Sequence, residues 1–320
     1  MKTYYLLLIA AVLLCGCKDE ITDTSNVNNG AWVKSSEVFV SRLIMCQNGY
    51  IIGINGSEAL ISKDNGSYWK SVGFPYNIQS LCSGTNDELY TASSNNLLLS
   101  TSYGTMWDWK PVSFDNEMGG VTYPDILCSA VSPDNVLYIG TSYGLLCSGD
   151  KGNTWKRFVN GIRNLKIVSL LISKNGTIFA ESVDEESVLY MSSDKGDSWQ
   201  KTTVTGQTIT ALAEDSTGTI YAGGLFKLYK SSDNGLSWSS DLAPGTKFTS
   251  IFCDKNNRVF TSFDEGGLYM STDKGTTWTD KTPDSSATKM PVFNVAISRH
   301  GYLIASTAKG LYKSKDSEYK

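Results

Sequence analysis

Short apolar runs separated by turn residues dominate the chain. Ile209 to Ala213 is one such run; a turn at Asp215 to Gly218 follows, and further runs extend from Thr219 to Gly223 and from Leu228 to Ser231. Runs of about four to six residues, rich in β-branched and aromatic residues and divided by Gly, Asn and Asp, are typical of strands. Beyond the N-terminal segment, no ten-residue stretch has helical periodicity. The pattern predicts an all-β chain.

An eight-residue phrase, Ser-x-Asp-x-Gly-x-x-Trp, returns along the chain. Its full copies begin at Ser62, Ser148, Ser192, Ser231 and Ser271. A degenerate copy begins at Ser100 and has Ser102 in place of the Asp, and a truncated copy runs from Ser314 to Asp316. The steps between copies are 38, 48, 44, 39, 40 and 43 residues, and a period near 40 indicates a repeat architecture. Seven four-stranded units arranged radially would form a β-propeller.

The two ends of the chain complement each other in this scheme. The last unit has three apolar runs and no Trp, whereas Gly30 to Lys34 resembles the Gly-x-x-Trp end of the phrase without the rest. We therefore expect Trp32 and its neighbours to form the outermost strand of the seventh blade. Such a strand would close the ring and leave no unpaired interior edge.

The phrase resembles the Asp-box, or bacterial neuraminidase repeat. This repeat occurs in sialidases, sortilin-type receptors, xyloglucan-cleaving hydrolases and a photosystem assembly factor of plants and cyanobacteria. The resemblance covers residues 31 to 316 and implies a seven-bladed β-propeller, but no particular activity. It also implies that the Asp-box hairpins occupy one rim and that ligands bind the opposite face, near the central channel.

The residues of the phrase suit a tight hairpin turn. The Asp can accept hydrogen bonds from backbone N–H groups, the Gly can adopt positive φ, and the Trp can pack between neighbouring sheets. We expect this structural role for Asp64, Asp150, Asp194, Asp233 and Asp273, and for Trp69, Trp107, Trp155, Trp199, Trp238 and Trp278. A metal site is the alternative. One carboxylate per turn is too few for calcium, which takes six or more oxygens, so we expect no metal.

The N-terminal segment is typical of an export signal. Lys2 precedes an apolar run from Tyr4 to Leu14, which is too short to span a bilayer. Leu14 to Cys17 resembles a bacterial lipobox, which implies cleavage before Cys17 and lipidation of its thiol. An ordinary signal peptide with incidental cysteines is the alternative. Lys18-Asp19-Glu20 resembles the signal of surface-exposed lipoproteins of Bacteroidetes.

These features predict three segments. Residues 1–16 would be a lipoprotein signal peptide, residues 17–30 a flexible tether and residues 31–320 the propeller domain. The protein would be an outer-membrane lipoprotein exposed at the cell surface, with a periplasm-facing orientation as the alternative. Its contact with the membrane would be through the lipid anchor only.

Composition excludes several other classes. The formal net charge is −4, and no basic run is present that could neutralise the phosphates of a nucleic acid. His300 is the only histidine, so a multi-histidine metal site is impossible. Five cysteines beyond Cys17 are scattered through apolar segments without a CxxC pair, which disfavours both a disulfide framework and zinc. We expect no cofactor.

The 48-residue step marks an insertion of about ten residues, and long loops are where binding residues concentrate. Its candidate ligand-binding residues are Trp109, Phe114, Asp115, Glu117 and Tyr123. Loops on the same predicted face add Tyr143, Arg157, Arg163, Asp184, Glu185 and Phe226. The alternative is that Trp109 only packs against its own blade and that the charges form rim ion pairs of little energetic worth.

Two kinds of function remain open. The first is a non-catalytic, lipid-tethered, monomeric binding or scaffold protein whose partner is a glycan or an outer-membrane or extracellular protein. The second is a glycoside hydrolase. A sialidase needs three converging arginines, and the chain has only five in all. Hydrolysis by paired carboxylates would require carboxylates among Asp115, Glu117, Asp184, Glu185, Glu186 and Asp264 to converge. No catalytic residue is assigned from the sequence.

Overall fold

The computed structural model describes residues 27–28, 31–56, 58–73, 78, 80–116, 118–184, 186–283 and 289–317. All regular secondary structure in these ranges is β-strand. Within them, no helix is long and apolar enough to cross a membrane. The predicted signal peptide, the tether up to residue 26, Cys17, Glu117 and Glu185 lie outside the described residues.

The strands form antiparallel sheets in which successive strands pair. Four sheets have four strands each. They comprise β3 (Arg42–Met45), β4 (Ile51–Asn55), β5 (Glu58–Ser62) and β6 (Lys70–Gly73); β7 (Ser80–Ser83), β8 (Leu89–Ser93), β9 (Asn96–Ser100) and β10 (Asp108–Pro111); β13 (Ile126–Val131), β14 (Leu137–Thr141), β15 (Gly144–Ser148) and β16 (Lys156–Arg157); and β17 (Ile167–Ile172), β18 (Ile178–Val183), β19 (Ser187–Ser192) and β20 (Gln200–Thr205).

Two larger sheets and a hairpin complete the described strands. A seven-stranded sheet contains β21 (Ala211–Glu214), β22 (Ile220–Gly223), β23 (Leu225–Ser231), β24 (Ser239–Cys253), β25 (Val259–Phe263), β26 (Leu268–Ser271) and β27 (Thr279–Asp280). Its long strand β24 serves as the last strand of one four-stranded group and the first strand of the next. A five-stranded sheet runs in the order β1 (Val27–Asn28), β2 (Trp32–Ser36), β30 (Gly310–Ser314), β29 (Leu303–Thr307), β28 (Val292–Ile297). The hairpin is β11 (Phe114–Asp115) with β12 (Val121–Thr122).

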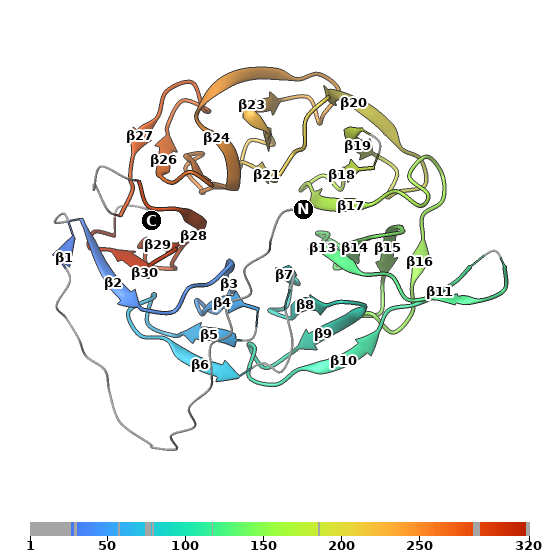
Figure 1. The fold of residues 1–320 in the computed structure, drawn as a ribbon, viewed down its shortest axis with the longest axis horizontal. Helices are drawn as coiled ribbons and strands as arrows, with labels where there is room; N and C mark the ends of the chain where they lie inside the picture. Colours follow the sequence, from blue (N-terminus) through green and yellow to red (C-terminus); the bar gives the residue numbers. More distant parts are fainter. Residues whose placement is uncertain are drawn as a thin grey trace, which may run out of the picture.

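The sheets follow one another around a ring, and the first strand of each lies nearest the centre (Figure 1). The first strands contact one another in the order β3, β7, β13, β17, β21, β24, β28 and again β3. Strand β2, from the start of the domain, pairs with β30 from its end, and Trp32 lies opposite Ser314. The protein is an all-β propeller, and this prediction from the sequence is confirmed.

The core lies between neighbouring sheets. Tyr90 and Leu97 of one sheet pack with Ile126 and Leu146 of the next. Neighbouring sheets cover both faces of each sheet, so the side chains of the second strands are buried on both faces. Strands β8 and β14 are buried at every residue. This explains why the sequence shows short, continuous apolar runs rather than strict alternation.

Candidate functional site

The repeated phrase forms the turn between the third and fourth strands, and its Ser and Asp hold that turn together. In the copy at Ser192, the Ser192 Oγ accepts a hydrogen bond from the Gly196 N–H at 2.8 Å and donates one to the Asp194 Oδ1 at 2.7 Å. The same carboxylate accepts the N–H and the hydroxyl of Ser198 at 2.9 and 2.6 Å. The other full copies repeat the Ser-to-Asp, Gly-to-Ser and backbone bonds.

The backbone of the turn needs two successive residues with positive φ. Lys195 has φ 59° and Gly196 has φ 93°, a pair typical of the type I′ turn that matches the twist of a hairpin. In the degenerate copy, Ser102 Oγ accepts the Met106 N–H at 2.9 Å and lies 3.3 Å from the Ser100 Oγ, a longer contact than the Ser-to-Asp bonds of the full copies. The turn therefore survives there with fewer bonds.

The hydrogen bonds to these carboxylates stabilise their ionised form. Bonds from Ser198 lower the pKa of Asp194 to about 2, and bonds from Ser237 do the same for Asp233. Equivalent bonds from Thr154 and Thr277 lower the pKa of Asp150 and Asp273 to about 2. Among the described residues, no group of three or more His, Cys, Asp or Glu side chains could hold a metal ion. The geometry is that of a turn clamp.

The tryptophans of the phrase pack against the preceding sheet. The Trp238 ring meets Phe179 edge-on at 6.1 Å between centroids, and Trp199 meets Phe158 at 6.4 Å in the same way. The indole N–H of Trp238 donates to the Gly235 carbonyl at 3.0 Å. Trp69, Trp107, Trp155 and Trp278 likewise belong to clusters shared with a neighbouring sheet.

The carboxylates in the loops on the other side of the sheets brace those loops. The Asp184 carboxylate accepts the Lys166 N–H at 2.7 Å and the Ser182 hydroxyl at 3.0 Å. In the second half of the seven-stranded sheet, Glu265 accepts the Thr246 N–H at 2.5 Å. In each case a loop between the second and third strands is tied to the segment that enters the same sheet. These side-chain carboxylates thus accept hydrogen bonds from backbone N–H groups of their own loops.

The insertion forms the β11–β12 hairpin, which projects outward from the ring beyond β16 (Figure 1). It does not stand at the mouth of the central channel, where the sequence led us to expect ligand loops. Phe114 packs into the cluster between the sheets β7–β10 and β13–β16. Of the insertion's other residues, Met118 and Tyr123 are exposed, at 99% and 57%.

Three of the predicted residues meet at the base of this hairpin. The Arg157 guanidinium lies 4.3 Å from the Phe114 ring centroid and donates through Nη2 to the Tyr143 carbonyl at 3.2 Å and to the Asn164 side chain. Burial lowers the pKa of Arg157, and its Nε is buried without a hydrogen-bond partner in the described part of the chain. We call Phe114, Tyr143, Arg157 and Asn164 the hairpin site.

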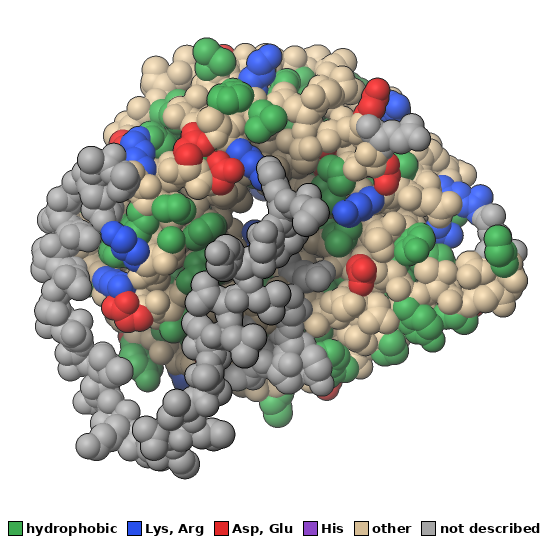
Figure 2. Space-filling model, viewed as in Figure 1, with side chains coloured by type: hydrophobic (Ala, Val, Ile, Leu, Met, Phe, Trp, Pro, Cys, Tyr) green, Lys and Arg blue, Asp and Glu red, His purple; other side chains and the backbone are tan. Residues whose placement is uncertain are grey.

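An apolar surface adjoins the hairpin site. Tyr143 is 49% exposed, and Met118, Val121 and Tyr123 are all exposed on or next to the hairpin. Figure 2 shows hydrophobic side chains gathered at this edge of the molecule, beside β10 and β11. Asn164 is a member of the hairpin site that the sequence did not indicate, because a lone loop Asn carries no distinguishing signal.

The remaining predicted residues lie elsewhere. Trp109 belongs to the outer strand β10 and not to a loop. It pairs with Leu98, which packs with Ile54 of the preceding sheet, whereas Phe114 packs on the other face of the sheet β7–β10. Arg163 is exposed in the loop before β17, and Asp115 is exposed on the hairpin. Phe226 is 55% exposed in β23, at a φ of 59°, with the sheet β17–β20 between it and Tyr143.

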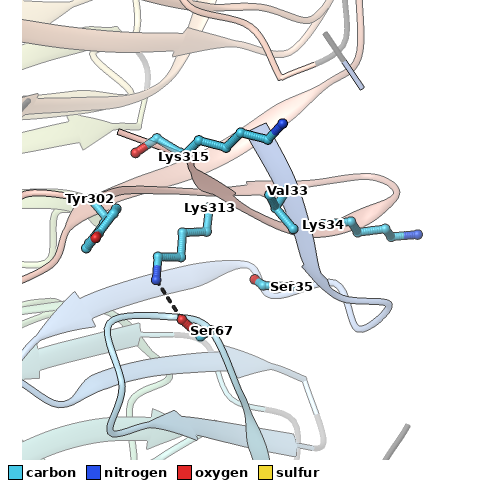
Figure 3. A pocket seen from close by; sticks show the side chains of 8 residues that line it. Val33, Lys34, Ser35, Ser67, Tyr302, Lys313 and Lys315 are labelled. Carbon is cyan, nitrogen blue, oxygen red and sulfur yellow. Dashed lines mark hydrogen bonds between the residues drawn. The ribbon is translucent and has the colours of Figure 1, made fainter. Parts of the chain in front are cut away.

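A cavity that the sequence did not indicate lies on the Asp-box side of the ring. It measures about 320 Å³ and is lined by Val33, Lys34, Ser35, Ser67, Tyr302, Lys313, Ser314 and Lys315 (Figure 3). We call it the seam cavity, because its walls come from β2, from β30 and from the first Asp-box turn. No sequence signal could have shown it, since its residues come from both ends of the domain.

The family of the chain follows from a family model. The model of the photosynthesis system II assembly factor YCF48 matches residues 38–311. The chain belongs to the YCF48 family. A search of curated proteins finds no match.

Solved structures share the propeller fold of this YCF48-family chain at low sequence identity. An extracellular domain of BT4673 from B. thetaiotaomicron has a TM-score of 0.70 at 15% identity, over 90% of this chain and 40% of that one. The chain thus spans about two-fifths of that relative's length. A YCF48 bound to D1 peptide has a TM-score of 0.68 at 15% identity, covering 90% and 97% of the two chains. Virginiamycin B lyase from Staphylococcus aureus reaches 0.70 at 7% identity, over 87% and 94%.

Proposed function

We propose that this protein is a non-catalytic binding propeller of the cell surface that captures a protein segment at the hairpin site. The observation that carries the proposal is the arginine at that site. The Arg157 side chain is wedged against Phe114, beside exposed Tyr143, and its buried Nε has no acceptor in the described residues. A buried donor without a partner costs free energy, and a bound chain that shifts this side chain and supplies an acceptor would remove that cost.

The chemistry of the surface favours a protein over a glycan. A bound peptide offers carbonyl oxygens to Arg157 and apolar side chains to Tyr143, Met118 and Tyr123. Aromatic and Met side chains and Arg are the types enriched at protein interfaces. Within the same family, a YCF48 has been solved bound to D1 peptide, which supports a peptide-like ligand here. A glycan stacked on Tyr143 is the competing occupant.

Binding is favoured over hydrolysis because of how the loop carboxylates are used. Paired carboxylates would need to face one substrate some 5 to 10 Å apart. Asp184 and Glu265 instead accept backbone N–H groups of their own loops, and Asp115 lies on the outward hairpin. The lyase with a similar fold shares 7% identity, which supports the fold and not the reaction.

The setting we propose is the outer surface of a bacterial cell. The lipobox-like Leu14 to Cys17 supports lipidation at Cys17, and a structural relative is an extracellular domain. We also propose a seven-bladed ring closed by Trp32. The pairing of β2 with β30 and the contact of β28 with β3 support it.

Affinity capture with matched variants tests the function. The full chain is used to capture proteins from an envelope extract of the source cells, alongside Arg157→Met and Tyr143→Ala. Leu236→Ala is the control, because Leu236 is 69% exposed and lies in an Asp-box turn. One protein should be retained by the parent and the control and lost from both hairpin-site variants.

Two parallel assays address the competing functions. Binding to a glycan array that Tyr143→Ala abolishes would replace the protein partner with a carbohydrate. Release of reducing sugar from envelope glycans, abolished by Asp184→Asn, would overturn the non-catalytic proposal.

A further inference from the structure

The seam cavity is remote from the hairpin site and presents a different chemistry. Strand β2 supplies Val33 and Ser35, strand β30 supplies Lys313, and the first Asp-box turn supplies Ser67. Val33 and Lys313 are directly paired across the two strands, so their side chains emerge on the same face of the sheet. The cavity therefore exists only where the two ends of the domain meet.

A lysine ammonium stands inside this cavity without a carboxylate. The Lys313 Nζ donates to the Ser67 Oγ at 2.6 Å and lies 4.1 Å from the Tyr302 ring centroid (Figure 3). Within the described residues it forms no ion pair. Burial lowers the pKa of Lys313, an effect that the charge of Asp64 partly offsets. The cation is thus partly desolvated and incompletely compensated.

Apart from the Asp64 carboxylate, which accepts the Ser67 N–H, the charged and hydroxyl groups near Lys313 are cations or donors. Lys315 lies at the edge of the cavity with its ammonium pointing away from that of Lys313, and Lys34 points away from the cavity toward Glu37 (Figure 3). The Ser67 hydroxyl accepts from Lys313, and within the described residues its proton and that of the Tyr302 hydroxyl are not donated to any partner. No carboxylate lines the cavity. The lining therefore suits a small anion with several acceptor oxygens.

Lysine favours one class of anion over another. A planar carboxylate is best matched by the fork of an arginine, whereas a lysine acts as a point charge and is a common phosphate ligand. The cavity volume of about 320 Å³ lies at the small end of the range for ligand pockets. We propose that the seam cavity binds a phosphate monoester through Lys313 and Ser67, with the Lys315 side chain turning in from the edge.

The phosphate could be carried by a membrane lipid or by a soluble molecule. Strand β2 directly follows the segment that the sequence predicts to be a tether to a lipid anchor, so lipid headgroups are one source. Sugar phosphates are the other. The inference does not depend on partner binding at the hairpin site.

Calorimetric titration of the full chain with inorganic phosphate tests the site. Lys313→Gln and Lys315→Gln remove the two cations, and exposed Lys255, which lies in the turn between β24 and β25, gives the control Lys255→Gln. The parent and the control should bind phosphate. Lys313→Gln should bind about tenfold more weakly or worse, as expected for loss of a charged hydrogen bond. Lys315→Gln, at an exposed position, should also weaken binding and is not expected to disturb folding.

A second arm separates the two sources. Vesicles of phosphatidylcholine with and without phosphatidic acid, and glucose 6-phosphate in solution, are compared with the same variants. Lysine-dependent binding to the phosphatidic acid vesicles assigns a lipid headgroup, and such binding to the sugar phosphate alone assigns a soluble ligand. Absence of phosphate binding by the parent, or equal weakening by Lys255→Gln, would overturn the proposal.

Discussion

Among single residues, the Ser and the Asp of the Asp-box clamp the turn through different sets of hydrogen bonds. The Ser hydroxyl fills the interior of the turn, where Ser192 is 2% exposed. The Asp lies outside it and gathers the donors of the returning strand. The two positions should therefore respond differently to substitution and to pH.

Replacing the interior hydroxyl should destabilise the fold. Ser192→Ala leaves the Gly196 N–H without its acceptor, which should lower the free energy of unfolding by about 1–3 kcal/mol. Chemical denaturation measures the change, with exposed Ser240→Ala in β24 as the control. Similar stability of the two variants would mean that the hydroxyl does not hold the turn.

Acid should weaken the same turns through their carboxylates. The pKa of Asp150, Asp194, Asp233 and Asp273 is about 2 in the fold, below the value of about 3.9 expected for an unfolded chain. Their stabilising effect is complete above pH 4 or so and is lost as the pH falls toward 2. Thermal unfolding from pH 6 to pH 2 should show this decline.

The slope of that decline identifies its source. The double variant Asp194→Asn, Asp233→Asn should lose less stability on acidification than the parent, because two of these Asp-box carboxyl groups no longer titrate. Asp108→Asn, at an exposed position on β10, serves as the control. An unchanged slope in the double variant would assign the acid sensitivity to other groups.

At the scale of elements, each sheet is held to the preceding one by the tryptophan that follows its clamp. Phe179 is fully buried and lies edge-on against Trp238. Trp238→Ala should therefore lower the unfolding free energy by about 3 kcal/mol. Trp109→Ala, on an outer strand at 41% exposure, should cost much less. Denaturation of the two variants side by side measures the difference, and equal losses would contradict a role for Trp238 between sheets.

The strands and turns of each unit are predictable from the sequence because the signals for them are local. The strand lengths, the turn residues and the recurring Trp all fall within one unit of sequence. The hairpin's direction was not predictable, because it depends on Phe114 finding space between two sheets. The burial of Glu181 is also not indicated by the sequence. This side chain is fully buried, its Oε2 has no partner among the described residues, and burial raises its pKa to about 8.

At the scale of the whole molecule, β2 couples the start of the domain to its end. Trp32 is 4% exposed and packs with Tyr312 and Leu303. A variant starting at Glu37 would leave β30 as an open edge, which favours unfolding or aggregation. It should be insoluble or melt well below a variant starting at Val27. Comparable melting temperatures would show that ring closure by β2 contributes little.

The seam cavity also forms only in the complete ring, so the sequence carries no local signal for it. Lys313 and Ser67 are far apart in the chain and meet only when the ring is complete. In the sequence they are indistinguishable from ordinary surface residues. The hairpin site likewise has no local signal, because only the fold brings Phe114 and Arg157 into contact.

The hairpin site, proposed to bind a protein partner, lies on the side of the sheets away from the Asp-box turns. Site-specific photo-crosslinking on cells tests this binding most directly, with the crosslinker placed at Tyr143 or at Tyr123, and at Leu236 for comparison. All three positions are exposed, and Leu236 lies in an Asp-box turn. One crosslinked protein is expected from both tyrosine positions and none from Leu236. Crosslinks from Leu236 alone, or equally from all three, would contradict binding at the hairpin site.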